Sequence, residues 1–391
     1  SLITKAVEGA MRVGKSRPAV KSAIDIIRSS QTLPIEDALA DERAVFMHLR
    51  LQPDALALRH IFFAERESAK LPIDLLANPL TVETICVIGA GTMGSGIVIS
   101  ALDAGMKVIL LEQNEDALHR GKERVVSYSR ERVANLKMKA SSAAQREAHL
   151  QCTLEWNEIS KADLIIEAVF EELSVKQEVF KKIDQFARQG AVLTTNTSYL
   201  DLDAIAKVTT RPQDVIGLHF FSPANVMKLL EVVRGNDSRR EVIATGMALG
   251  KRLKKLPVLA GNKFGFIGNR IYNAYRNQCE FMLEDGALPE EVDAALKQFG
   301  MAMGPFAVAD MSGLDIAWRM RKSQAHARPE GIRYVDILDK LCEAGRLGRK
   351  TGLGYYTYVN GKQDPVSDSV VRQIIEDASF RRGIQRKKLS A

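Results

Sequence analysis

The sequence has no long hydrophobic run. A membrane-spanning helix needs roughly 18 uninterrupted apolar residues, and no segment of the 391-residue chain approaches that length. The first residues, SLITKAVEGAMR, also lack the charged-then-apolar layout of a signal peptide. These two absences predict a soluble, intracellular protein that does not insert into a membrane.

Cysteine is scarce, and the cysteines that are present lie far apart. There are four of them, with no CxxC spacing: Cys86, Cys152, Cys279 and Cys342. This distribution argues against a zinc site and against a disulfide framework, so we expect no metal centre. A reducing compartment fits such cysteine usage.

A long block of one charge sign is also missing, although the net charge is +7. The basic residues form short groups such as KRLKK at 251–255 and RRGIQRKK at 381–388. Such groups are typical of a solvated surface, and some could attract an anionic ligand. We expect no nucleic-acid partner.

The chain is longer than the roughly 100 to 200 residues of one domain, so it predicts several units. Residues 1–80 look helical and charged, and the steps Leu71-Pro72 and Asn78-Pro79 disfavour a continuing helix. We expect this stretch to be a helical linker or the tail of another domain. Residues 359–391 are polar and basic and are expected to be a second connection.

From Thr84 the pattern changes to short apolar runs separated by amphipathic stretches. The runs are TICVIG, KVILLE, ADLIIEAV, AVLTTN, VIGLHFF and MKLLEVV. Such alternation indicates a parallel sheet covered on both faces. The fold class predicted is α/β, with a Rossmann-type doubly wound domain over 81–258 and an all-α domain over 259–358.

A glycine-rich segment lies between the first strand and the helical pattern after it. In GAGTMG, Gly89 permits a tight turn, Gly91 lets the backbone approach a pyrophosphate, and Gly94 allows a helix to pack closely on a strand. Free N–H groups at a helix start attract the anion. The strand before this motif and the helix after it give the context of a dinucleotide site.

The second strand, KVILLE, ends in Glu112, which lies twenty-three residues after Gly89. An acid at this place hydrogen-bonds the ribose hydroxyls of the cofactor and repels a 2′-phosphate. The predicted cofactor is therefore NAD and not NADP. A glycine turn with an unrelated surface acid is the alternative.

Small polar residues follow the strand AVLTT. Asn196, Thr197 and Ser198 would project from its carboxyl end, where ligands bind in open α/β sheets. The same residue types are common in turns and caps, so the cluster alone leaves both interpretations open.

His219 occupies the carboxyl end of VIGLHFF, and Glu231 ends the next apolar run, MKLLE. Removal of hydride from a secondary alcohol leaves a hydroxyl proton, and a histidine is the usual base for it. A buried carboxylate needs a partner, and an imidazole across a hairpin would provide one while Glu231 fixed its tautomer. A core histidine with an unrelated surface acid is the alternative.

Seven motifs together resemble the L-3-hydroxyacyl-CoA dehydrogenase family, in particular the dehydrogenase part of multifunctional β-oxidation enzymes that also carry an enoyl-CoA hydratase. They run in the family's order from Thr84 to about Tyr358: GAGTMGSGI, EAVFEELSVKQEVF, NTSYL, HFFSPANVMKLLEVV, FGFIGNR, MGPFAVADMSGLD and GRKTGLGYY. One departure is Ser222, where many single-function members have asparagine. The serine form resembles the multifunctional branch.

The resemblance implies a set of site residues. The catalytic group comprises His219, its orienting acid Glu231, and two residues that hold the substrate oxygen, Ser198 and Asn269. The cofactor contacts implied are Gly89, Gly91, Thr92, Met93, Gly94, Glu112, Ala168, Glu171, Lys176 and Asn196.

The activity implied is NAD-dependent oxidation of an (S)-3-hydroxyacyl-CoA to the 3-ketoacyl-CoA in fatty acid β-oxidation. The hydratase core is not in this chain, so we expect no hydratase activity, and residues 1–80 resemble the segment that joins the two enzymes. The helical domain is expected to form a homodimer or to pack on a second helical repeat. The compartment implied is bacterial cytoplasm, or the peroxisome in a eukaryote.

Two other interpretations remain. A β-hydroxyacid dehydrogenase would act on free acids and would not need the HFF histidine. A non-catalytic NADH-binding protein would keep the fold without the reaction, and the full set of His219, Glu231, Ser198 and Asn269 argues against it.

Overall fold

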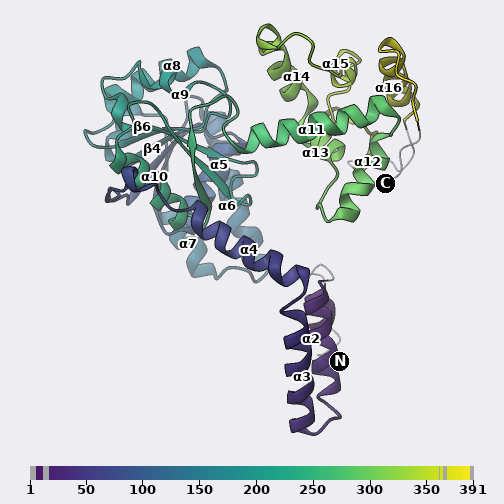
Figure 1. The fold of residues 1–391 in the computed structure, drawn as a ribbon. Coiled ribbons are helices and arrows are strands. Elements are labelled where there is room, and N and C mark those ends of the chain that lie inside the picture. The colour runs from purple at the N-terminus through teal and green to yellow at the C-terminus, as the bar shows by residue number, and fades with distance from the viewer. Residues whose placement is uncertain (1–5, 12–16, 361, 364–367, 388–391) are drawn as a thin grey trace. The chain divides into compact units, whose positions relative to one another are not determined.

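The computed structural model describes residues 6–11, 17–360, 362–363 and 368–387. The chain divides into two compact units, residues 1–264 and 265–391 (Figure 1). Among the described residues, no helix is both long enough and apolar enough to cross a lipid bilayer. The predicted combination of a Rossmann-type sheet and a following helical domain is confirmed.

The first unit is built on an eight-stranded sheet in the order β3-β2-β1-β4-β5-β6-β7-β8. Its strands are β1 (Thr84–Ile88), β2 (Lys107–Leu111), β3 (Leu150–Thr153), β4 (Leu164–Glu167), β5 (Val192–Thr195), β6 (Val215–Phe220), β7 (Leu229–Arg234) and β8 (Leu256–Gly261). The strands from β3 to β6 are parallel, whereas β7 runs antiparallel to β6, and β8 is parallel to β7. The carboxyl ends of β1, β4, β5 and β6 therefore meet at one edge.

Helices cover both faces of this sheet. They are α5 (Thr92–Asp103), α6 (Glu115–Ala134), α7 (Ala140–Ala148), α8 (Leu173–Phe186), α9 (Leu202–Ala206) and α10 (Arg240–Arg252). Side chains from α5 and α10 share one buried cluster with alternate strand residues such as Ile85 and Val87. Because successive strand residues point to opposite faces, Cys86 lies on the other face, where α8 packs against β4.

Two strands and one boundary differ from what the sequence suggests. β3 is a short edge strand that is only partly buried. β8 contains Pro257, and its missing N–H is tolerated because an edge strand has a neighbouring strand on one side only. β3 lacks the continuous apolar run that marks a central strand, and in β8 the proline interrupts the run. Since β8 ends at Gly261, the sheet continues past the boundary expected at residue 258.

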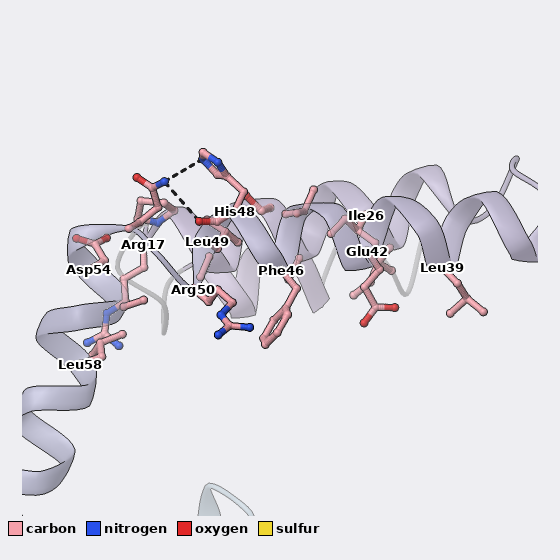
Figure 2. Close-up of a pocket in the computed structure, with 18 of the residues that line it drawn as sticks. Arg17, Ile26, Leu39, Glu42, Phe46, His48, Leu49, Arg50, Asp54 and Leu58 are labelled. Carbon is pink, nitrogen blue, oxygen red and sulfur yellow. Dashed lines mark hydrogen bonds between the residues drawn. The ribbon is translucent and has the colours of Figure 1, made fainter.

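The helices α2 (Pro18–Ser29), α3 (Ile35–Leu49) and α4 (Pro53–Ser68) precede the sheet. A groove of about 1170 Å³ lies along α2, α3 and the first turns of α4 and is lined mainly by apolar side chains (Figure 2). Its lining residues lie between Arg17 and Arg59. It therefore contains none of the residues predicted to bind the cofactor or to act in catalysis.

The second unit is helical. It contains α11 (Gly268–Asp285), α12 (Pro289–Phe299), α13 (Pro305–Ser312), α14 (Leu314–Ser323), α15 (Ile337–Glu343) and α16 (Ser369–Arg381), and a short hairpin of β9 (Tyr358–Val359) and β10 (Lys362–Gln363). The segment 359–391, expected to be a connection, thus holds a packed helix. Val371, Ile375 and Ala378 recur at helical spacing and are buried with α11 and α15, a stripe that the polar and basic flanks obscure in the sequence.

Asp310 organises the loop that follows α15. Its carboxylate accepts the N–H groups of Tyr355 and Tyr356 at 2.8 and 3.0 Å and the hydroxyl of Tyr358 at 3.1 Å. Burial raises the pKa of Asp310 from 3.8 to about 6. The protonated form is therefore favoured more in the folded chain than in the unfolded chain.

This raised pKa predicts a pH-dependent stability. The contribution of Asp310 to the free energy of unfolding is full below its usual pKa of 3.8 and falls as the pH rises through about 6. A difference of about two pKa units corresponds to about 3 kcal/mol. The advantage of the wild type over Asp310→Asn should shrink by up to that amount between about pH 4 and about pH 7.

Urea unfolding followed by the fluorescence of Trp318 would measure this, in a Trp156→Phe background that leaves one tryptophan, in the helical unit. Asp377 is exposed on α16 and gives a matched control, because Asp377→Asn should change stability by less than about 0.5 kcal/mol at each pH. A difference between wild type and Asp310→Asn that stays constant or grows over this range contradicts the prediction.

Candidate active site

The glycine loop joins β1 to α5 at the carboxyl edge of the sheet. Gly89 has a φ of +103°, and a Cβ there would lie 2.7 Å from the carbonyl oxygen of Ala168. A Cβ on Gly94 would overlap the carbonyl oxygen of Gly89, so the first turn of α5 packs directly on the loop. A Cβ on Gly91 would meet no atom within 4 Å. The loop is thus closely packed against backbone atoms at Gly89 and Gly94, whereas there is free space beside Gly91.

The open part of the loop coincides with the start of α5. Gly91 is the residue before the helix, and Thr92 and Met93 are its first two residues. The first N–H groups of a helix have no acceptor within the helix and carry partial positive charge. These residues therefore fit the pyrophosphate of a dinucleotide.

Glu112 follows β2 and reaches back to the glycine loop. One carboxylate oxygen accepts the N–H of Ala90 at 2.8 Å, and the other accepts the N–H of Gln113 at 2.7 Å. These bonds fix the carboxylate beside the loop. An acceptor held there fits the hydroxyl groups of a ribose and opposes a phosphate on the same ribose.

A network of charged residues follows β4. Lys176 of α8 is 1% exposed, and its ammonium donates to Glu167 at 2.7 Å and lies 3.3 Å from Glu171. Glu167 is fully buried and also accepts the N–H of Val169 at 2.8 Å and the hydroxyl of Thr195 at 2.6 Å. Lys176 is thus placed inside the protein between two carboxylates, and its predicted contact with the cofactor stays a prediction.

The segment after β5 carries the small polar cluster. Asn196 accepts the N–H of Phe220 through its side-chain oxygen at 2.8 Å, which ties the end of β5 to the end of β6. Glu171 accepts the hydroxyl of Thr197 at 2.6 Å and the N–H of Ser198 at 2.7 Å. The structure therefore brings Glu171, Asn196 and Ser198 to the same edge of the sheet.

His219 and Glu231 are directly opposite each other on the antiparallel strands β6 and β7. Their side chains are 4% and 1% exposed, and Nδ1 of the imidazole lies 2.6 Å from a carboxylate oxygen. A carboxylate only accepts hydrogen bonds, so Nδ1 carries a proton and the basic lone pair of the neutral ring is on Nε2. This is the arrangement of a histidine base with an orienting acid.

Asn269 is the second residue of α11 and belongs to the other compact unit. It is partly buried. Its predicted role at the substrate oxygen stays a prediction.

Glu167 and Thr195 were not identified from the sequence, although a signal was present. Glu167 ends the apolar run LIIE in the same way as Glu231 ends MKLLE. The argument that a buried carboxylate needs a partner applies equally to both. Applied to β4, it predicts a buried partner for Glu167 without identifying which residue that partner is.

Comparisons with known proteins agree with this fold. Residues 84–263 match the model of the NAD-binding domain of 3-hydroxyacyl-CoA dehydrogenase, and residues 265–358 match the model of its C-terminal domain. Among curated relatives, the peroxisomal bifunctional enzyme of Danio rerio is 39% identical over 403 residues, which cover 97% of this chain and 55% of the relative. The human peroxisomal bifunctional enzyme is 40% identical over 370 residues, covering 90% of this chain and 51% of the relative. The chain thus spans about half the length of these relatives.

Solved structures give the same result. The (S)-3-hydroxybutyryl-CoA dehydrogenase PaaH1 of Ralstonia eutropha is 32% identical, with a TM-score of 0.67, and the match covers 72% of this chain and all of that one. The 3-hydroxybutyryl-CoA dehydrogenase of Escherichia coli is 36% identical, with a TM-score of 0.68, over 71% of this chain and 60% of that one. The predicted resemblance and the predicted NAD cofactor are confirmed. The motifs, the sheet and the glycine loop thus lead to one conclusion: the chain belongs to the 3-hydroxyacyl-CoA dehydrogenase family, a family of NAD-dependent oxidoreductases.

Proposed function

We propose that this chain oxidises (S)-3-hydroxyacyl-CoA to 3-ketoacyl-CoA, with His219 as the general base and Glu231 as its orienting acid. The observation that carries the proposal is the buried pair of these residues, 2.6 Å apart across β6 and β7. His219 lies near the carboxyl end of β6, at the same sheet edge as the glycine loop. A base at this edge is suited to act beside a nicotinamide.

The cofactor, when bound along the glycine loop and Glu112, accepts a hydride. His219 takes the proton of the 3-hydroxyl group on Nε2, and the Glu231 carboxylate stabilises the imidazolium that forms. Ser198 and Asn269 hold the substrate oxygen while the carbonyl forms, a role that their motifs imply. One hydride and one proton thus leave the alcohol, which balances its oxidation to a ketone.

The family also guides our proposals about the rest of the chain. We propose that the unit that holds the sheet binds NAD, that the helical unit binds the acyl-CoA, and that residues 1–80, parts of which lie outside the described residues, join the sheet to a further domain. Apolar side chains of the helical unit such as Ile271, Phe299 and Phe380 are largely exposed. They would be covered by a second copy of the chain or by a second helical repeat.

The relatives guide our proposals about context. The relatives of Danio rerio and human are named peroxisomal bifunctional enzymes, and one of Arabidopsis thaliana is named a peroxisomal fatty acid β-oxidation multifunctional protein. We therefore propose β-oxidation as the pathway and a peroxisome as the compartment. Bacterial cytoplasm is the alternative compartment.

His219→Gln and Glu231→Gln test the proposed base and its partner. General acid–base catalysis contributes about 10² to 10⁴ in rate, so each change should lower kcat by about that range while the Kd for NADH changes by less than about threefold. The measurement is acetoacetyl-CoA-dependent loss of NADH absorbance. His119 is exposed on α6, and His119→Gln serves as the matched control. Unchanged turnover in either site variant refutes the assignment.

Glu112→Gln tests the proposed choice between NAD and NADP. Loss of the charge should weaken NADH binding by about tenfold, because hydrogen bonds to charged groups contribute about 1.5–3 kcal/mol. NADPH binding should improve relative to NADH, since the repulsion of the 2′-phosphate is removed. Calorimetric titration of both cofactors measures this, with Glu115→Gln as a nearby exposed control. An unchanged ratio of the two Kd values would contradict the role of Glu112.

Acetoacetyl-CoA and free acetoacetate separate the three candidate functions. We expect kcat/KM for the thioester to exceed that for the free acid by at least about 10³, because binding energy from remote parts of a substrate is used at the reacting centre. Equal rates would favour a β-hydroxyacid dehydrogenase. Tight NADH binding without turnover of either compound would favour a non-catalytic protein.

A further inference from the structure

Glu171 lies in the loop between β4 and α8 and gathers three donors from consecutive residues of another loop. One of its carboxylate oxygens accepts the hydroxyl of Thr197 at 2.6 Å, the N–H of Ser198 at 2.7 Å and the N–H of Tyr199 at 3.2 Å. These donors span the segment between β5 and α9 on which Ser198 lies. The carboxylate is therefore bonded to the backbone on both sides of the Ser198 side chain.

The other oxygen of Glu171 faces the interior. It lies 3.3 Å from the ammonium of Lys176, which is 1% exposed and donates to the fully buried Glu167. Glu167 is fixed in turn by the N–H of Val169 and the hydroxyl of Thr195. Glu167 thus fixes the position of the Lys176 ammonium, and Glu171 lies between this ammonium and the loop that carries Ser198.

The neighbouring acid shows that this arrangement is specific. Glu172 is exposed, and its carboxylate accepts only the hydroxyl of Ser174, at 2.7 Å, among the described residues. Glu171 is also exposed in part, yet it accepts donors from a segment 26 to 28 residues away. Glu171 differs from an ordinary surface acid because its second oxygen lies next to the buried Lys176, which is itself paired with the buried Glu167.

The loop is also held at its far end. Thr197 accepts the N–H of Leu200 at 3.1 Å, and Asn262, just after β8, accepts the N–H of Leu202 at 3.1 Å. Glu171 therefore adds a constraint at the end that carries Ser198, beside the bond from the N–H of Phe220 to Asn196. Because a hydroxyl must be placed to within a fraction of an ångström to bond a reacting oxygen, this constraint bears directly on catalysis.

We propose that Glu167 and Lys176 position Glu171, and that Glu171 positions Ser198 toward the substrate hydroxyl. This rests on the proposed function, in which Ser198 holds the substrate oxygen. Glu171 is then a positioning residue that acts through Ser198, in addition to any contact it makes with the cofactor. The end of β4, the start of α8 and the Ser198 loop form one unit.

A double-mutant cycle tests this coupling. The kcat for reduction of acetoacetyl-CoA at saturating NADH is measured for the wild type, Glu171→Gln, Ser198→Ala and the double variant. We expect Glu171→Gln to lower kcat by at least about tenfold alone and by less than about twofold in the Ser198→Ala background, because residues that act through one another are not additive. Glu172→Gln is the matched control and should leave kcat unchanged.

Three results would overturn the proposal. Fold-changes that multiply in the double variant show that Glu171 acts independently of Ser198. A weaker Kd for NADH in Glu171→Gln with an unchanged kcat shows that its role is confined to cofactor binding. An unchanged kcat in Ser198→Ala removes the residue through which Glu171 is said to act. The proposed function itself fails separately, through absence of acetoacetyl-CoA turnover by the wild-type chain.

Two further variants change the partners of Glu171, one in the Ser198 loop and one in the protein interior. Thr197→Val removes one donor to Glu171 and leaves its charge, and it should lower kcat severalfold with the Kd for NADH unchanged. Lys176→Met removes the buried cation and should add less than about twofold to the effect of Glu171→Gln. Circular dichroism and the unfolding midpoint check that each variant folds. If Lys176→Met does not fold, Thr197→Val and the cycle decide the matter, and an unchanged kcat in Thr197→Val counts against the proposal.

Discussion

The pairing of a buried carboxylate with a donor on a neighbouring segment is the interaction on which this structure depends most. Glu231 is paired with His219 across two strands, and Glu167 with Lys176 between a strand and the helix that follows it. Removing one partner of a buried pair typically costs about 3 to 5 kcal/mol, because the remaining charge is left without compensation. Each pair therefore fixes the relative position of the two segments that carry it, and both pairs lie where strands of the sheet meet the predicted site.

Much of the fold follows from local patterns. The central strands are continuous apolar runs because both of their faces are covered, and the glycine loop predicts its own strand and helix. The edge strands β3 and β8 escape detection for the complementary reason: an edge strand needs less apolar surface and tolerates Pro257. The reversal at β7 agrees with the hairpin that the pairing of His219 with Glu231 requires, although the apolar runs as a set predict only parallel strands. α16 shows how a helical stripe can be hidden by charged flanks.

Some of the predicted site residues could likewise be placed from local patterns, and others could not. The pairing of His219 with Glu231 is predicted from the need of a buried acid for a partner, whereas their catalytic role stays a prediction. The position of Lys176 could not be derived, since the direction of a side chain in the first turn of a helix depends on what the end of β4 offers it. Its ammonium is directed to Glu167, and this partner emerges only when strand, loop and helix are seen together. The role of Asn269 depends on the second unit and is therefore beyond local reasoning.

The order of the strands explains how so few contacts can assemble the site. β4, β5 and β6 are adjacent and parallel, so the residues after their last ladder positions are brought to one edge without long connections. Glu167 ends β4, Asn196 follows β5, and His219 is near the end of β6. Asn196 bonds the backbone of β6, and Glu171 bonds the backbone after β5, so each strand end is tied to its neighbour by a side chain. In the proposed positioning of Ser198, a displacement at the end of β4 would reach this residue through Lys176 and Glu171. The geometry of this edge is thus set by three strands together and not by single residues.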